Sequence, residues 1–176
     1  MRLSRTLTAG AALVALVSLT GCGGGGDGAT DDLGLPSAGD IASIEKLVNQ
    51  YATCDNLRPR DEKEDRWGTL AKDPAWAIKE RARCDDDSNQ NITLLAISDM
   101  AKFQAANRKA SEGGKNNEAL IGKNFAIVAE GDETGQALMK AKMLILTCSG
   151  DYPIPGGYKQ HKGLAEGCVL TDYNRS

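Results

Sequence analysis

In the second half of the chain, short continuous apolar runs alternate with stretches whose apolar residues recur every three or four positions. A short apolar run bounded by polar residues predicts a buried strand, and the three-to-four spacing predicts a helix. The predicted elements are a strand at 92–97, a helix from Ser98 or Asp99 to Gly113, strands at 119–121 and 125–129, a helix from Thr134 to Ala141, and a strand at 143–147. The two middle strands are either joined by a turn or form one strand bent at Gly122. This β-α-β-β-α-β order is that of a split βαβ, ferredoxin-like arrangement.

The first half of the chain predicts two helices ahead of this unit. The first spans 40–52, because its apolar residues share one face: Ile41, Ile44, Leu47, Val48 and Tyr51. The second runs from Ala75 to about Arg83, since Asp73 can cap a helix and Pro74 suits its first position. We expect a charged loop at 55–66, or a short charged helix at its end. We also expect a turn at 85–91 and an irregular tail after Ser149. Together these features predict an α+β fold with a small mixed or antiparallel sheet.

The first residues of the chain have the layout of an export signal. Arg2 and Arg5 precede an apolar run at 11–19, and small residues follow. The run is shorter than the ~20 residues that a membrane span needs. The residues that follow, Leu19-Thr20-Gly21-Cys22, resemble the lipobox of bacterial lipoproteins. The resemblance implies that the Cys22 sulfur receives a diacylglyceryl group and that cleavage makes Cys22 the new N-terminus; the alternative is an ordinary signal peptide that leaves Cys22 as a free thiol.

The sequence therefore divides into three parts. Residues 1–21 are expected to be a signal peptide, 22–39 a lipidated cysteine followed by a flexible Gly-rich tether, and 40–176 a single globular domain. Removal of Arg2 and Arg5 with the signal takes the net charge from −3 to −5, and the remaining charges are interspersed. Nucleic acid is therefore not an expected partner.

Four cysteines remain in the expected domain: Cys54, Cys84, Cys148 and Cys168. An even number of cysteines in an exported domain is typical of disulfides, and four cysteines allow three pairings. We favour Cys54–Cys84 and Cys148–Cys168, because each pair closes a local loop. A zinc site is less favoured, since closely spaced Cys-x-x-Cys pairs are absent.

The sequence contains few residue patterns that are typical of catalytic sites. The chain has one histidine, His161, which excludes sites built on two or more histidines, and nothing in the spacing selects a nucleophile for it, Ser149 included. The alternating acids and amides of 85–91 begin like a calcium loop, but Gln90 stands where glycine is required and Ala96 where glutamate is required. Asp132 and Glu133 could flank a substrate or could simply be helix N-terminal charges. The sequence indicates no catalytic residue, metal ligand or cofactor.

The function expected from these features is a lipid-anchored bacterial surface lipoprotein on the extracytoplasmic face of the cell membrane. Its domain is expected to be a non-enzymatic binding or accessory module for a protein or envelope partner, because the weak catalytic inventory favours binding. A secreted hydrolase that uses carboxylates or His161, and a small-ligand sensor that acts with a membrane partner, remain as alternatives. The Gly-rich tether also resembles those of lipoproteins from high-GC Gram-positive bacteria.

Cys22→Ala should abolish lipid attachment, because it removes the sulfur that would carry the acyl chains. Two or three chains anchor a protein stably, since each buried CH₂ contributes about 0.8 kcal/mol. We expect the variant to accumulate as uncleaved precursor or as shed protein, measured by detergent partitioning and mass spectrometry of the N-terminus. An unmodified N-terminus in the wild-type protein would contradict the lipoprotein interpretation.

Overall fold

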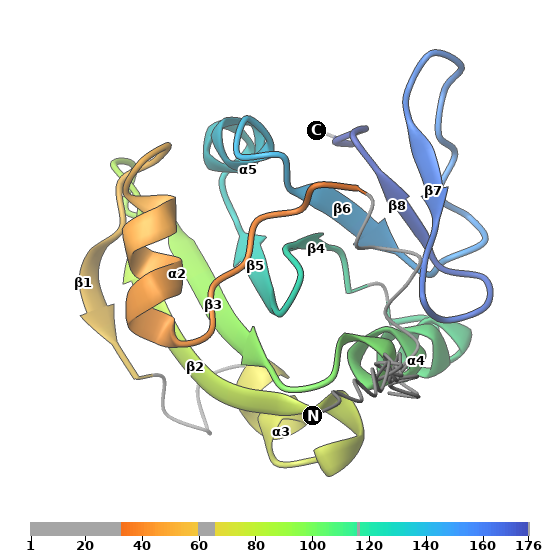
Figure 1. The fold of residues 1–176 in the computed structure, drawn as a ribbon, viewed down its shortest axis with the longest axis horizontal. Coiled ribbons are helices and arrows are strands. Elements are labelled where there is room, and N and C mark those ends of the chain that lie inside the picture. Colours follow the sequence, from red (N-terminus) through yellow and green to blue (C-terminus); the bar gives the residue numbers. More distant parts are fainter. Residues whose placement is uncertain (1–32, 60–65, 116, 176) are drawn as a thin grey trace, which may run out of the picture.

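The structure, a computed structural model, describes residues 33–59, 66–115 and 117–175. The expected signal peptide, Cys22 and the expected tether up to residue 32 lie outside these residues. The described strands are β1 (Asp55–Arg58), β2 (Ile78–Asp85), β3 (Asn91–Ile97), β4 (Ala119–Ile121), β5 (Phe125–Ala129), β6 (Leu144–Thr147), β7 (Gln160–Lys162) and β8 (Val169–Thr171). They form one antiparallel sheet in the order β1-β2-β3-β5-β4-β6-β8-β7 (Figure 1).

Helices cover both faces of the sheet. The described helices are α2 (Ile41–Val48), α3 (Arg66–Ala71), α4 (Met100–Glu112) and α5 (Asp132–Met139), with a 3-10 turn at Pro74–Trp76. On one face, Trp67 of α3 and Phe103 of α4 pack against Leu95 of β3. On the other, Ile44 of α2 and Leu138 of α5 join the cluster that contains neighbouring β3 residues such as Leu94. Successive residues of a strand point to opposite faces, so the continuous apolar run of β3 supplies both cores.

The α+β fold and the β-α-β-β-α-β order are confirmed by β3, α4, β4, β5, α5 and β6. Asp99 caps α4 by accepting a hydrogen bond from the Lys102 N–H, and Gly113 follows its last residue. Strands β4 and β5 are separate and joined by a turn. The last strand of the unit, β6, pairs with β4, while β2 occupies the position next to β3. The sheet thus extends beyond the unit on both sides.

The predicted helix at 75–83 is wrong, because that segment is a 3-10 turn followed by β2. Ala82 and Cys84 are buried while their neighbours are more exposed, which is the period of a strand. Cys84 lies opposite Ile92 of β3, so pairing with this apolar strand overrides the helical start signal at Asp73 and Pro74. The expected loop begins with the edge strand β1, and the tail contains the β7–β8 hairpin.

The predicted disulfide pairing is confirmed. Cys54 is bonded to Cys84, and Cys148 is bonded to Cys168. The first bond links the start of β1 to β2, and the second links the end of β6 to the start of β8. Two buried disulfides indicate an oxidising, extracytoplasmic compartment. Among the described residues, no helix has the length and apolar character that crossing a membrane requires.

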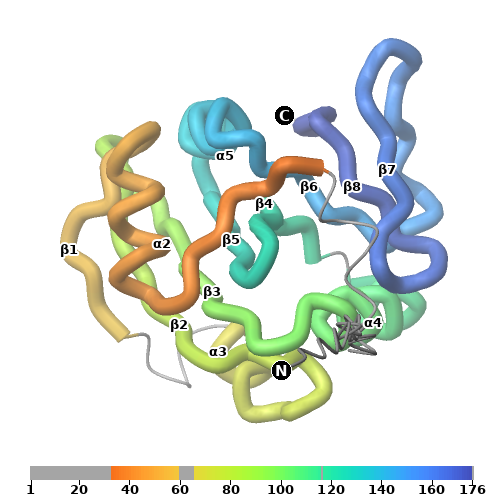
Figure 2. Tube along the Cα trace, viewed as in Figure 1, coloured from red at the N-terminus to blue at the C-terminus, as the bar shows by residue number. Residues whose placement is uncertain are grey.

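The chain ahead of α2 packs along the sheet on the turn between β4 and β5 (Figure 2). The Lys123 N–H donates to the Pro36 carbonyl, and the Asn124 side-chain oxygen accepts from the Ser37 hydroxyl and the Ala38 N–H. Leu35 and Ala38 are buried. The packed part of the chain therefore extends N-terminal of Asp40, to Leu33, which is partly buried against the core.

Gly122→Ala should destabilise the fold, because a Cβ at Gly122 would lie 2.1 Å from the ring of Phe125. Phe125 is fully buried and cannot move aside. We expect a loss of about 1 to 3 kcal/mol in the free energy of unfolding, measured by denaturant titration. Gly156→Ala is the matched control, since its Cβ would enter open space. Equal stability of the two variants would contradict the packing described here.

Candidate functional site

Two hollows flank the connection between β5 and α5, and both include Gly131 and Asp132. The larger, which we name the α5 cleft, has a volume of about 460 Å³. Its lining residues are Tyr51, Ala52, Thr53, Asp86, Asp87, Ser88, Gln90, Gly131, Asp132, Glu133, Thr134 and Ala137. The smaller, which we name the tail pocket, has a volume of about 80 Å³. The larger volume lies in the range of ligand-binding clefts.

Asp86 connects the β2–β3 turn to α5 at the α5 cleft. One of its carboxylate oxygens accepts hydrogen bonds from the Ser88 and Gln90 N–H groups at 2.9 and 2.8 Å, which shapes the β2–β3 turn. The other accepts from the Thr134 hydroxyl at 2.8 Å. Only 9% of Asp86 is exposed. One buried side chain therefore fixes both the β2–β3 turn and the first turn of α5, and both segments line the cleft.

The same hydrogen bonds determine the protonation state of Asp86. Burial works to raise the pKa of its carboxyl, as does the neighbouring Asp85. The hydrogen bonds from Gln90, Thr134 and Ser88 outweigh both effects, so the pKa of Asp86 lies below its usual value. The group is therefore ionised near neutral pH, where it accepts hydrogen bonds and is not a proton donor.

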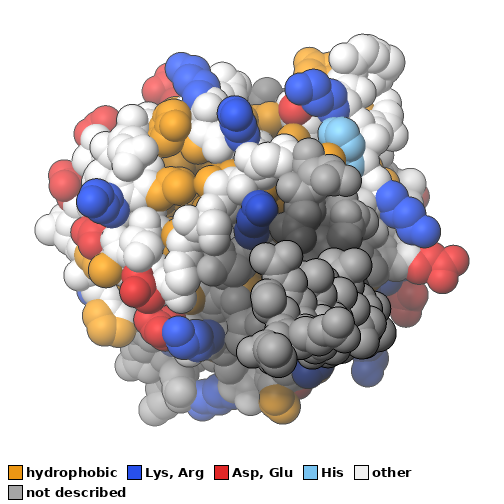
Figure 3. All heavy atoms as spheres, viewed as in Figure 1, with side chains coloured by type: hydrophobic (Ala, Val, Ile, Leu, Met, Phe, Trp, Pro, Cys, Tyr) orange, Lys and Arg blue, Asp and Glu red, His pale blue; other side chains and the backbone are white. Residues whose placement is uncertain are grey.

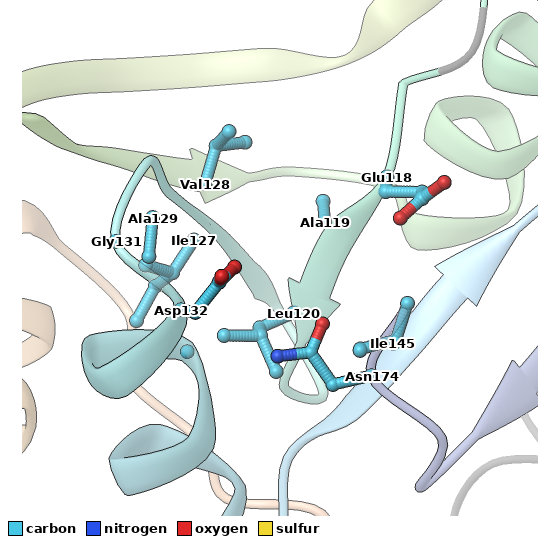
Figure 4. Close-up of a pocket in the computed structure, with 11 residues that line it drawn as sticks. Glu118, Ala119, Leu120, Ile127, Val128, Ala129, Gly131, Asp132, Ile145 and Asn174 are labelled. Atoms are coloured by element: carbon cyan, nitrogen blue, oxygen red, sulfur yellow. The ribbon is translucent and has the colours of Figure 1, made fainter. Parts of the chain in front are cut away.

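The tail pocket has an apolar floor and a polar rim (Figure 4). Leu120, Ile127 and Ile145 of the sheet lie at its base. Glu118, just ahead of β4, Asp132 at the start of α5 and Asn174 of the C-terminal tail surround it (Figure 4). Its volume of about 80 Å³ is about a sixth of that of the α5 cleft. The tail pocket therefore suits a single small group.

The structure separates the residues considered in the sequence. Asp132 and Glu133 occupy the first turn of α5 and line the α5 cleft. His161 lies on β7 and lines neither hollow. Within the described ranges, its imidazole has no hydrogen-bond partner, and Ser149 instead accepts from the Asp151 N–H. The same ranges contain no group of three potential metal ligands.

The segment 85–91 forms a turn, as predicted, and Asn89 adopts the left-handed conformation that asparagine tolerates. The contact between Asp86 and Thr134 was not predicted. The turn-forming residues at 86–90 predict the turn itself. No pattern in the sequence predicts that Asp86 contacts a residue 48 positions further along the chain.

Asp86→Asn should lower stability and weaken its dependence on pH. The pKa of Asp86 in the folded protein lies below the value of an unfolded aspartate, about 3.9. Its contribution is therefore fully present above about pH 4 and is lost as the pH falls through the folded-state pKa. At pH 7 we expect a loss of about 1 to 3 kcal/mol, measured by denaturant titration.

Below about pH 4, the free energy of unfolding should fall less steeply with acid for Asp86→Asn than for the wild type. Asp87→Asn is the control, because Asp87 is an exposed neighbour on the same turn. If Asp87→Asn changed stability as much as Asp86→Asn, the assigned role of Asp86 would be wrong.

Comparison of the chain with known protein families, curated proteins and solved structures finds no match. The function proposed for this chain therefore rests on its own residues.

Proposed function

We propose that this chain is a lipid-anchored bacterial surface lipoprotein whose domain is a non-enzymatic binding or accessory module for an envelope protein. The anchor is supported by the lipobox-like residues that end at Cys22, after an apolar run of signal-peptide length. Export is supported by the two buried disulfides. A protein held in this way meets its partners at the membrane surface.

The observation that carries the binding proposal is that Asp86 is ionised and hydrogen-bonded within the protein. It is the buried carboxylate of the larger hollow, and its oxygens are occupied by three hydrogen bonds from the protein itself. A general acid or base needs a proton-transfer group that can reach the substrate. Asp86 instead supports the wall of the α5 cleft, which favours binding over acid–base catalysis.

The chemistry of the cleft favours a partner with basic side chains. Asp87, Asp132 and Glu133 present exposed carboxylates around it, and Ser88 adds an exposed hydroxyl. Complementary charge raises the rate and the specificity of protein association. The alternative of a hydrolase has less support, because His161 lies outside both hollows.

The proposal predicts that reversing charge at the cleft releases the partner. A photo-crosslinking amino acid at Ser88, used in intact cells, should capture a defined protein. The double variant Asp87→Lys and Glu133→Lys should reduce the crosslink yield about tenfold, because it replaces attraction by repulsion. The charge-matched control is the double variant Asp151→Lys and Glu166→Lys, since both residues are exposed and line neither hollow.

Circular dichroism should show that all these variants are folded. A crosslink that survives the double variant at full yield, or the absence of any specific crosslink, would contradict binding at the α5 cleft.

A further inference from the structure

Strand β7 forms an open edge of the sheet. It is the outermost strand beyond β8 in the sheet order, and Figure 1 shows it at the side of the molecule. Lys159, Gln160 and Lys162 are exposed. An open edge offers unpaired main-chain groups to an extended segment of another chain.

The hydrogen bonds of the hairpin show which main-chain groups are free. The Gly163 N–H donates to the Cys168 carbonyl at 2.9 Å, and the Lys159 N–H donates to the Asp172 carboxylate at 2.7 Å. In an antiparallel pair, alternate residues direct their N–H and C=O groups toward the partner strand. The main-chain N–H and C=O groups of His161 therefore point toward β8, and those of Gln160 and Lys162 point away from the sheet.

The edge carries positive charge that is not neutralised. Within the described ranges, neither the Lys159 nor the Lys162 ammonium group has a carboxylate partner, although Asp172 accepts from the Lys159 backbone and Glu166 lies in the hairpin loop. Basic side chains are visible over the part of the molecule that β7 and β8 form (Figure 3). Tyr158, 46% exposed, lies at the end of the same edge, with its ring 4.7 Å from that of Tyr173.

We propose that β7 binds an extended acidic segment of a partner protein, which adds to the sheet as a further antiparallel strand. Opposite-charge pairs stabilise directly opposed positions on neighbouring strands. The bound segment should therefore carry one acidic residue opposite Lys162 and another opposite Lys159, three positions later. The next residue should be aromatic, because it lies opposite Tyr158.

A second copy of this chain suits the edge less well than an acidic segment. Pairing of β7 with β7 would bring Lys159 and Lys162 of both copies together, and like charges across strands are destabilising. The β7 edge shares no residue with the lining of the α5 cleft, so binding at either surface can fail without the other.

The test uses the purified full chain in detergent and a fluorescent capped peptide. The peptide has two glutamates separated by valine and threonine, followed by phenylalanine. Its control has lysines in place of the glutamates. Fluorescence anisotropy should show saturable binding of the glutamate peptide and at least about tenfold weaker binding of the lysine peptide. The double variant Lys159→Glu and Lys162→Glu should reverse this preference, whereas Lys140→Glu, just after α5, should leave it unchanged.

Gln160→Pro tests the main-chain contacts separately from charge. It removes an outward N–H that the fold does not use, and proline is tolerated at such an edge position. We expect the affinity for the glutamate peptide to fall about tenfold, the effect of losing one hydrogen bond to an otherwise paired strand. Circular dichroism should confirm that each variant is folded.

Three results would overturn the proposal. The first is equal binding, or no binding, of the two peptides by the folded wild-type protein. The second is unchanged affinity in both the double lysine variant and Gln160→Pro. The third is a dimer, measured by light scattering, that Gln160→Pro abolishes, because β7 would then pair with a second copy through its main chain.

Discussion

Burial of β3 on both of its faces is the constraint on which the rest of the structure depends. Residues Ile92 to Ile97 are all buried, and alternate side chains enter different cores. A strand of this kind needs neighbours on both sides and helices on both faces. Strands β2 and β5 supply the neighbours, α3 and α4 cover one face, and α2 and α5 cover the other.

The features that bear on function lie where this two-faced sheet ends or turns. The turn from β2 to β3 carries Asp86, and the connection from β5 carries Gly131 and the start of α5. Their meeting forms the α5 cleft, which Asp86 fixes through Thr134. The disulfides restrain strands toward the two ends of the sheet, and the outer strand β7 is left open. Binding surfaces are thus placed on a rigid scaffold.

The sequence predicts the centre of this fold better than its periphery. The run at 92–97 and the cap at Asp99 are local signals, and the structure agrees with them. The helix predicted at 75–83 is wrong, because only Ala82 and Cys84 show the period of strand β2 and a helix start signal precedes them. Both disulfides were predicted because each closes a local loop. The contact of Asp86 with Thr134 depends on how α5 docks, which no local pattern encodes.

The central claim is that the domain binds an envelope partner through the α5 cleft while its sheet remains unchanged. Amide hydrogen exchange should be compared between the purified protein in detergent and the protein in membranes isolated from the producing cells. We predict slower exchange in the membranes at 86–90 and 131–137, two segments that line the cleft, and equal exchange in β3. Identical exchange at both segments in the two samples would contradict the claim.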